Sequence, residues 1–173
     1  MSWAGRDIKR IVWHCSATSQ TATPEGILSY WKTPKLPPGG DPSVKYPYIP
    51  GKQGGKGWRS PGYAIIIPPD GTLYQYAEAH EITNGVRGYN RDSLHLCWIG
   101  GKGGQDNRTE AQKRIMAALT LQLLKPSRLG PVPVVGHRDL SRDRNGDGII
   151  SRNEWVKLCP SFDVAAWMRE IQA

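Results

Sequence analysis

Residues 62–77, GYAIIIPPDGTLYQYA, combine two strand-like runs with a tight turn between them. The first run, 62–67, is almost entirely apolar and is followed by the pair Asp70-Gly71, which favours the tight turn of a β-hairpin. The second run, TLYQYA at 72–77, follows this turn and is expected to form the partner strand. The stretch therefore predicts two neighbouring strands of one sheet.

Outside this hairpin, short apolar runs alternate with segments of helical periodicity. We expect further strands at 8–13, 93–99 and 131–136, and helices at 24–32, 109–125 and 161–171. The predicted helix caps are Thr23, Thr109 in a capping box with Gln112, and Ser161. Strands interspersed with helices predict an α/β fold around one sheet. The length suits one domain covering residues 1–173.

The segment between the first helix and the hairpin has a different composition. Residues 33–61, TPKLPPGGDPSVKYPYIPGKQGGKGWRSP, are dense in Pro, Gly and Lys. We expect a long loop insertion rather than a linker, because recognisable elements lie on both sides. Long loops inside compact domains are usually functional or mobile, so this segment is a candidate rim of a substrate groove.

The chain is strongly basic, with a formal net charge of +8. Such a surface attracts a polyanion, which could be nucleic acid, an anionic membrane face or a bacterial envelope. The alternative is a basic protein without a polyanionic partner. No apolar run is long enough for a transmembrane helix. The N-terminal residues lack the apolar core of a secretory signal, so we expect synthesis in the cytoplasm without a signal peptide.

Two histidines and a cysteine stand at the ends of predicted elements. His14 ends the first strand, His137 follows the strand 131–136, and Cys159 precedes Pro160. Two imidazoles and one thiolate, with a fourth position left for water, form a catalytic zinc donor set. Taken singly, a histidine at a strand end is more often a hydrogen-bonded core or surface residue than a metal ligand. The chain has 3 Cys, an odd number that indicates free thiols or metal ligands rather than a disulfide framework.

Two more side chains could act beside such a metal. Lys157 stands two residues before Cys159, and in an extended segment these two side chains point the same way. A cation there would stabilise an oxyanion, although most lysines are solvated surface residues. Tyr63 lies at the start of the hairpin, and its phenol could orient an attacking water.

An oxygen-rich loop lies between His137 and Cys159. Residues 143–154, DRNGDGIISRNE, match the twelve-residue calcium loop of an EF-hand. The expected Ca²⁺ ligands are Asp143, Asn145, Asp147, Glu154 and the carbonyl of Ile149. The alternative is a surface turn held by hydrogen bonds without a metal. We expect an isolated loop with a structural role rather than a calcium switch.

Six motifs occur in order along the chain: HCSAT (14–18), GYAIII with PDG (62–71), GYN (88–90), CWIGG (97–101), GHRDL (136–140) and KLCPSFD (157–163). Together they resemble the zinc-dependent N-acetylmuramoyl-L-alanine amidases of the phage lysozyme and peptidoglycan recognition protein superfamily, the type-2 amidases. The resemblance covers nearly the whole chain, and the first and last motifs are specific.

The resemblance implies a mixed central β-sheet flanked by helices, with a substrate groove across a zinc ion. It implies that His14, His137 and Cys159 bind Zn²⁺, and that Tyr63 and Lys157 are the catalytic side chains. The implied reaction hydrolyses the amide between N-acetylmuramic acid and L-alanine of peptidoglycan. Peptidoglycan is then the expected partner, with no specific nucleic acid. We expect a monomer acting on the bacterial cell wall, in the manner of a phage or prophage endolysin. A cytoplasmic recycling enzyme or an injected effector enzyme is the alternative.

The chain departs from the family pattern at three places. The segment 33–61 is longer than in compact members, and the calcium-type loop 143–154 is inserted before the last motif. Gly85 stands where some relatives carry a histidine, so a substrate contact of that histidine cannot be transferred. His80 or His95 could replace it.

Two other functions compete with hydrolysis. Some superfamily members bind peptidoglycan without cleaving it and typically lack the cysteine ligand, so the presence of Cys159, Tyr63 and Lys157 favours an enzyme. A second regulatory partner such as RNA polymerase is neither supported nor excluded by the sequence.

Overall fold

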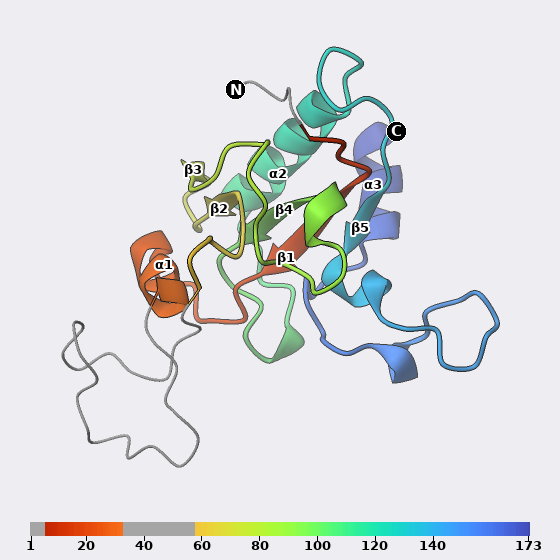
Figure 1. The fold of residues 1–173 in the computed structure, drawn as a ribbon. Coiled ribbons are helices and arrows are strands. Elements are labelled where there is room, and N and C mark those ends of the chain that lie inside the picture. The colour runs from red at the N-terminus through yellow and green to blue at the C-terminus, as the bar shows by residue number, and fades with distance from the viewer. Residues whose placement is uncertain (1–5, 33–57) are drawn as a thin grey trace.

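The structure is a computed structural model that describes residues 6–32 and 58–173. The predicted loop insertion 33–61 lies outside the described residues except for its last positions, 58–61. The described chain folds as one α/β unit around a central sheet (Figure 1).

Five strands form a mixed sheet in the order β3-β2-β4-β1-β5. The strands are β1 (Arg10–Cys15), β2 (Ile65–Ile67), β3 (Tyr74–Gln75), β4 (Ser93–Trp98) and β5 (Val134–Gly136). Neighbours pair in parallel, except that the edge strand β3 runs antiparallel to β2. The predicted hairpin and mixed sheet are confirmed. The hairpin is shorter than predicted, because Tyr76 and Ala77 both donate their N–H groups to the carbonyl of Ala64 and so end the regular ladder.

Three α-helices cover the sheet: α1 (Pro24–Lys32), α2 (Glu110–Leu123) and α3 (Val164–Gln172). In β2, Ile65 and Ile67 join the main core with α2 and α3, whereas Ile66 packs on the opposite face with Trp31 of α1. Parallel sheets are buried on both faces. The nearly continuous burial of β1 and β4 follows from this arrangement.

Trp13 in β1 ties both helices of the main core to the sheet. Its ring is fully buried and meets the Trp167 ring of α3 edge-on, with 6.0 Å between the centroids. Its indole N–H donates to Thr120 Oγ1 of α2 at 3.1 Å, which satisfies the polar edge of a buried aromatic. Because strand side chains alternate, the next residue, His14, faces the opposite side of the sheet.

The predicted caps of the first two helices are confirmed. Thr23 Oγ1 accepts the N–H of Gly26 at 3.1 Å. Thr109 and Gln112 form a reciprocal capping box at the start of α2. Local sequence is sufficient at these ends because cap and partner lie within one turn.

The prediction that the last helix begins at a Ser161 cap is wrong. Ser161 has a φ of 73°, which is not the extended conformation of a cap residue. Asp163 is extended, and its carboxylate accepts the N–H of Ala166 at 2.9 Å. The helix therefore starts at Val164, after the chain has turned away from the site described below.

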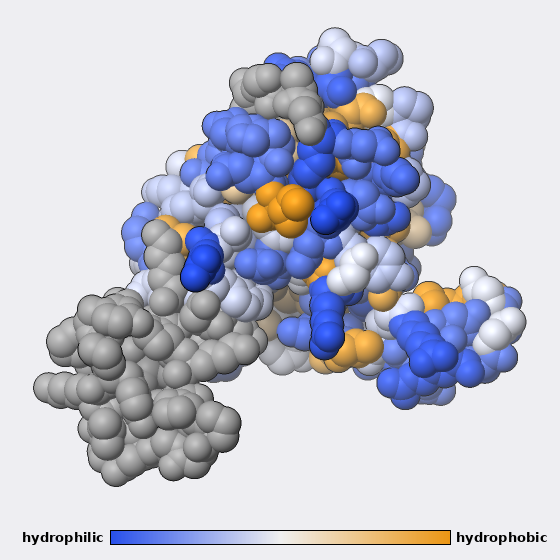
Figure 2. Space-filling model, in the orientation of Figure 1, coloured by the Kyte–Doolittle hydropathy of each residue, from blue (hydrophilic) through white to orange (hydrophobic). Residues whose placement is uncertain are grey.

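A loop segment projects from the domain between β5 and α3. This arm, residues 141–158, extends away from the sheet at the edge where β1 and β5 end (Figure 1). The face shown in Figure 2 is mainly hydrophilic, with small separate hydrophobic patches. Within residues 6–32 and 58–173, the helices are too short or too polar to cross a membrane.

Candidate active site

His14 and His137 are neighbours because two parallel strands end at the same edge of the sheet. Trp13 of β1 pairs with Gly136, the last residue of β5. The residues that follow, His14 and His137, therefore lie side by side at the carboxyl ends of these strands, with His137 opening a short 3₁₀ helix. Their ring centroids are 4.9 Å apart.

Cys159 is brought to the same place by contacts on both sides of it. The N–H of Arg138 donates to the carbonyl of Cys159 at 2.9 Å. The indole of Trp98 donates to the carbonyl of Pro160 at 3.1 Å. Gly136 permits this approach, because a Cβ at that position would lie 2.6 Å from Pro160 Cδ.

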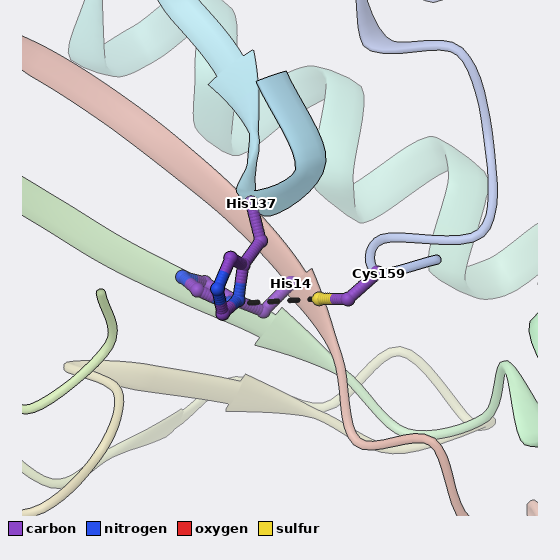
Figure 3. A group of neighbouring side chains, drawn as sticks. All are labelled: His14, His137 and Cys159. Atoms are coloured by element: carbon purple, nitrogen blue, oxygen red, sulfur yellow. Dashed lines mark hydrogen bonds between the residues drawn. The ribbon is translucent and has the colours of Figure 1, made fainter. Parts of the chain in front are cut away.

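Three donor atoms converge at this point (Figure 3). His14 Nδ1 lies 3.2 Å from His137 Nδ1 and 3.6 Å from Cys159 Sγ. With bonds of about 2.0–2.1 Å to nitrogen and 2.3 Å to sulfur, a tetrahedral zinc ion separates two nitrogens by about 3.3 Å and nitrogen from sulfur by about 3.6 Å. The residues present therefore fit the ion that the family resemblance implies. Within the described part of the chain, this is the one cluster of His, Cys, Asp and Glu with three donor atoms this close.

The electrostatics of the cluster suit a cation. Burial lowers the pKa of His14 well below its usual value, and the nearby His95 and His137 lower it further. Burial, together with Lys157, lowers the pKa of His137 to about 4. Both imidazoles are thus neutral near pH 7, which is the state that binds metals. Burial raises the pKa of Cys159, whereas a coordinated metal deprotonates a thiol outright.

A cavity of about 570 Å³ opens in front of the three donors. His137 and Cys159 line it at one end, and Lys157 lies beside them. The cavity continues past Tyr63 to Trp31 and Trp58. Four of the five predicted zinc-site residues line this cavity, namely Tyr63, His137, Lys157 and Cys159. The fifth, His14, is fully buried beside His137 and Cys159. Their roles stay predictions at this stage.

Tyr63 is held between two aromatic neighbours. Its ring centroid lies 4.7 Å from that of His14 and 5.2 Å from that of Trp31. Burial raises the pKa of Tyr63 well above its usual value, and the neighbouring Cys97, Cys159 and Cys15 raise it further. The phenol is therefore protonated near neutral pH and can serve as a hydrogen-bond donor.

The calcium-type loop 143–154 does not form a comparable cluster. The Asp143 carboxylate accepts the N–H groups of Gly146 and Gly148, and Glu154 accepts those of Arg144 and Ser151. The hydrogen bonds that Glu154 accepts from Arg144 and Ser151 lower its pKa to about 2. In the described chain, the carboxylates of the loop do not meet as three donors within 4.8 Å. Calcium binding by Asp143, Asn145, Asp147, Ile149 and Glu154 stays a prediction.

Sequence reasoning considered His95 only as a replacement for a missing histidine, and its actual position was not foreseen. It is fully buried in β4, and its Nδ1 lies 3.1 Å from His14 Nε2. The signal was available in principle, since alternation places His95 and Cys97 on one face of a strand. The sequence does not reveal that this strand lies beside β1 or in which register.

Comparisons with known proteins agree with this geometry. A family model described as "Amidase_2: N-acetylmuramoyl-L-alanine amidase" matches residues 4–149. A Haemophilus influenzae protein described as uncharacterized is 39% identical over 105 residues, which are 57% of this chain and 87% of that protein. The endolysin of Klebsiella phage KP32 is 32% identical over 116 residues, which are 65% of this chain and 66% of the endolysin.

A solved structure shares the fold at lower sequence identity. The Ph2119 endolysin from the Thermus scotoductus MAT2119 bacteriophage Ph2119 superposes with a TM-score of 0.64 at 19% identity, covering 96% of this chain and 86% of that one. The family match spans most of the chain, including β1, β4, β5 and the first two donor residues. The chain belongs to the N-acetylmuramoyl-L-alanine amidase family, within the type-2 amidase superfamily.

Proposed function

We propose that this protein is a zinc-dependent amidase that cleaves the bond between N-acetylmuramic acid and L-alanine in peptidoglycan, and that it serves cell-wall lysis as an endolysin. The observation that carries the proposal is the zinc-like spacing of His14, His137 and Cys159 at a cavity shared with Lys157 and Tyr63. The endolysin relatives support the biological setting.

The three donors, His14, His137 and Cys159, would hold Zn²⁺ at one position. When bound, zinc supplies a Lewis acid and lowers the pKa of water to about 7. The N–H of Cys15 donates to Cys159 Sγ at 3.2 Å and so favours the thiolate form. Three protein ligands would leave one coordination position for water, as in catalytic rather than structural zinc sites.

Lys157 and Tyr63 supply the remaining functions. The ammonium of Lys157 lines the cavity next to His137 and would stabilise the negative charge that develops on the carbonyl oxygen of the scissile amide. The phenol of Tyr63, protonated and packed on His14, would donate a hydrogen bond that orients the attacking water. The aromatic end of the cavity, with Trp31 and Trp58, offers apolar faces to the substrate.

A peptidoglycan-binding module without catalysis is the rival function. Binding alone requires the cavity but not a buried thiol aligned with two imidazoles. Cys159 has only 8% of its surface exposed and completes the donor set. The complete set favours the enzyme.

The decisive experiment identifies the bond that is cleaved. Purified peptidoglycan is digested with the protein, the products are analysed by mass spectrometry, and the metal content of the same sample is measured. We expect free stem peptides that begin with L-alanine, and one zinc per chain. His137→Ala should lose both the zinc and the products. Full activity of that variant without bound metal would contradict the proposal, as would products cut at another bond.

A further inference from the structure

We infer that His95 is a positioning residue that fixes the orientation and tautomer of His14, so that His14 presents Nδ1 to the metal site. The inference rests on the proposed zinc function and adds to it a residue from outside the donor set. It starts from the two nitrogens of His14, which face different groups.

The two ring nitrogens of His14 have separate partners. Nδ1 points toward His137 Nδ1 at 3.2 Å and Cys159 Sγ at 3.6 Å. Nε2 lies 3.1 Å from His95 Nδ1. Both rings are fully buried, so water does not compete for either nitrogen.

The position of His95 follows from strand register. Parallel pairing of β1 with β4 sets Val12 opposite His95 and His14 opposite Cys97. All four side chains therefore point to the same face, and His95 lies one pleat back from His14 on the adjacent strand. From there His95 contacts Nε2 of His14 and leaves Nδ1 of His14 free for the metal.

Tautomer chemistry makes this contact selective. A neutral imidazole carries one proton, and a nitrogen that binds a metal must be the one without it. If His14 binds through Nδ1, its proton is on Nε2 and needs an acceptor, which His95 Nδ1 supplies. Histidine ligands in metal sites generally donate their other N–H to such a partner.

Two further features favour this arrangement. Among the described residues, His95 Nε2 has no hydrogen-bond partner, so the contact with His14 is the one hydrogen bond of this buried ring. Gly85 covers the His95 ring on another side, and a Cβ at Gly85 would lie 2.3 Å from His95 Cγ. The His95 ring is thus confined between Gly85 and His14, and packing leaves undecided only which of its nitrogens carries the proton.

The test compares two substitutions at position 95. His95→Asn retains a polar atom near the position of Nδ1, whereas His95→Leu has similar bulk and no acceptor. Zinc affinity is measured by competition with a chromophoric chelator. We expect His95→Leu to bind zinc roughly 10- to 100-fold more weakly. His95→Asn should recover most of the affinity, and His80→Leu, at an exposed histidine, should match the wild type.

A spectroscopic readout keeps the inference falsifiable if His95→Leu fails to fold. In the zinc-loaded wild type, ¹⁵N-resolved spectra of the His14 ring should show Nδ1 coordinated and the proton on Nε2. Coordination through Nε2, or unchanged zinc affinity in a folded His95→Leu variant, would overturn the role of His95 alone. A wild-type protein that binds no zinc would overturn the proposed function with it, and cleavage of a different bond by a zinc-loaded protein would overturn only the proposed function.

Discussion

The two nitrogens and the ring of the His14 imidazole contact different groups. Nδ1 faces His137 and Cys159, Nε2 faces His95, and the ring lies beside that of Tyr63. A metal ligand held from several directions loses little conformational freedom when the ion binds. The end of a strand therefore holds this donor more rigidly than a loop would.

The proposed role of Lys157 predicts a large kinetic effect with no loss of metal. We expect Lys157→Ala to lower kcat/KM by roughly 100- to 1,000-fold, because the developing oxyanion loses a charged partner. Zinc content should stay at the wild-type level, since Lys157 is not a donor. Steady-state kinetics on a soluble muropeptide, with metal analysis of the same preparation, provides the measurement.

Lys125→Ala is the matched control for this experiment. Lys125 is an exposed lysine just after α2, and it does not line the cavity. Its removal should leave turnover unchanged. Wild-type turnover in Lys157→Ala would remove Lys157 from the mechanism.

At the scale of secondary-structure elements, Gln112 links α2 to the sheet. Its amide nitrogen donates to the carbonyls of Ile67 at 3.0 Å and Ile99 at 2.9 Å, just where β2 and β4 end. Its oxygen accepts the N–H of Thr109 at 3.0 Å. One fully buried amide thus completes a helix cap and satisfies two strand ends.

We predict that Gln112→Ala strongly destabilises the fold. The carbonyl of Ile99 loses its Gln112 donor, the N–H of Thr109 loses its acceptor, and the carbonyl of Ile67 keeps only the N–H of Ile99. These losses should lower the free energy of unfolding by about 3 kcal/mol. For a chain of this size, the melting temperature should fall by roughly 6–12 °C. Gln122→Ala, an exposed glutamine in the same helix, should change stability by less than about 0.5 kcal/mol. Equal melting temperatures for the two variants would show that the buried amide contributes little.

The elements differ in how much the sequence could predict. The bounds of α1 and the capping box of α2 were correct because cap, helix and partner are local. The start of α3 was wrong because Ser161 takes a left-handed conformation. That conformation belongs to the turn that carries Cys159 to the two histidines, and no local preference of Ser161 indicates it.

At the scale of the whole molecule, the net charge of +8 suits a target that is a polyanion. We predict that binding to intact cell walls weakens several-fold as salt rises from roughly 50 to 300 mM, because screening shortens the reach of surface charges. Co-sedimentation with purified walls measures the effect. Hydrolysis of a short soluble muropeptide serves as the control and should respond much less. Salt-independent wall binding would contradict electrostatic docking.

Gly85 is a residue whose role the sequence alone does not explain. The sequence alone marked it as a departure from the family pattern, with no physical reason for the change. In the structure, a side chain at Gly85, in the loop before β4, would collide with the ring of His95 in β4. The departure and the buried histidine are therefore parts of one local packing solution.

The sequence by itself determined the family and the α/β class and picked out His14, His137 and Cys159 as candidate donors, because short motifs specify chemistry and local periodicity specifies elements. Only the tertiary structure decided which nitrogen of His14 faces the donor cluster and that His95 contacts the other one. The physical reason is register: His14 and His95 are 81 residues apart in sequence, and only the parallel pairing of β1 with β4 sets them on one face at 3.1 Å.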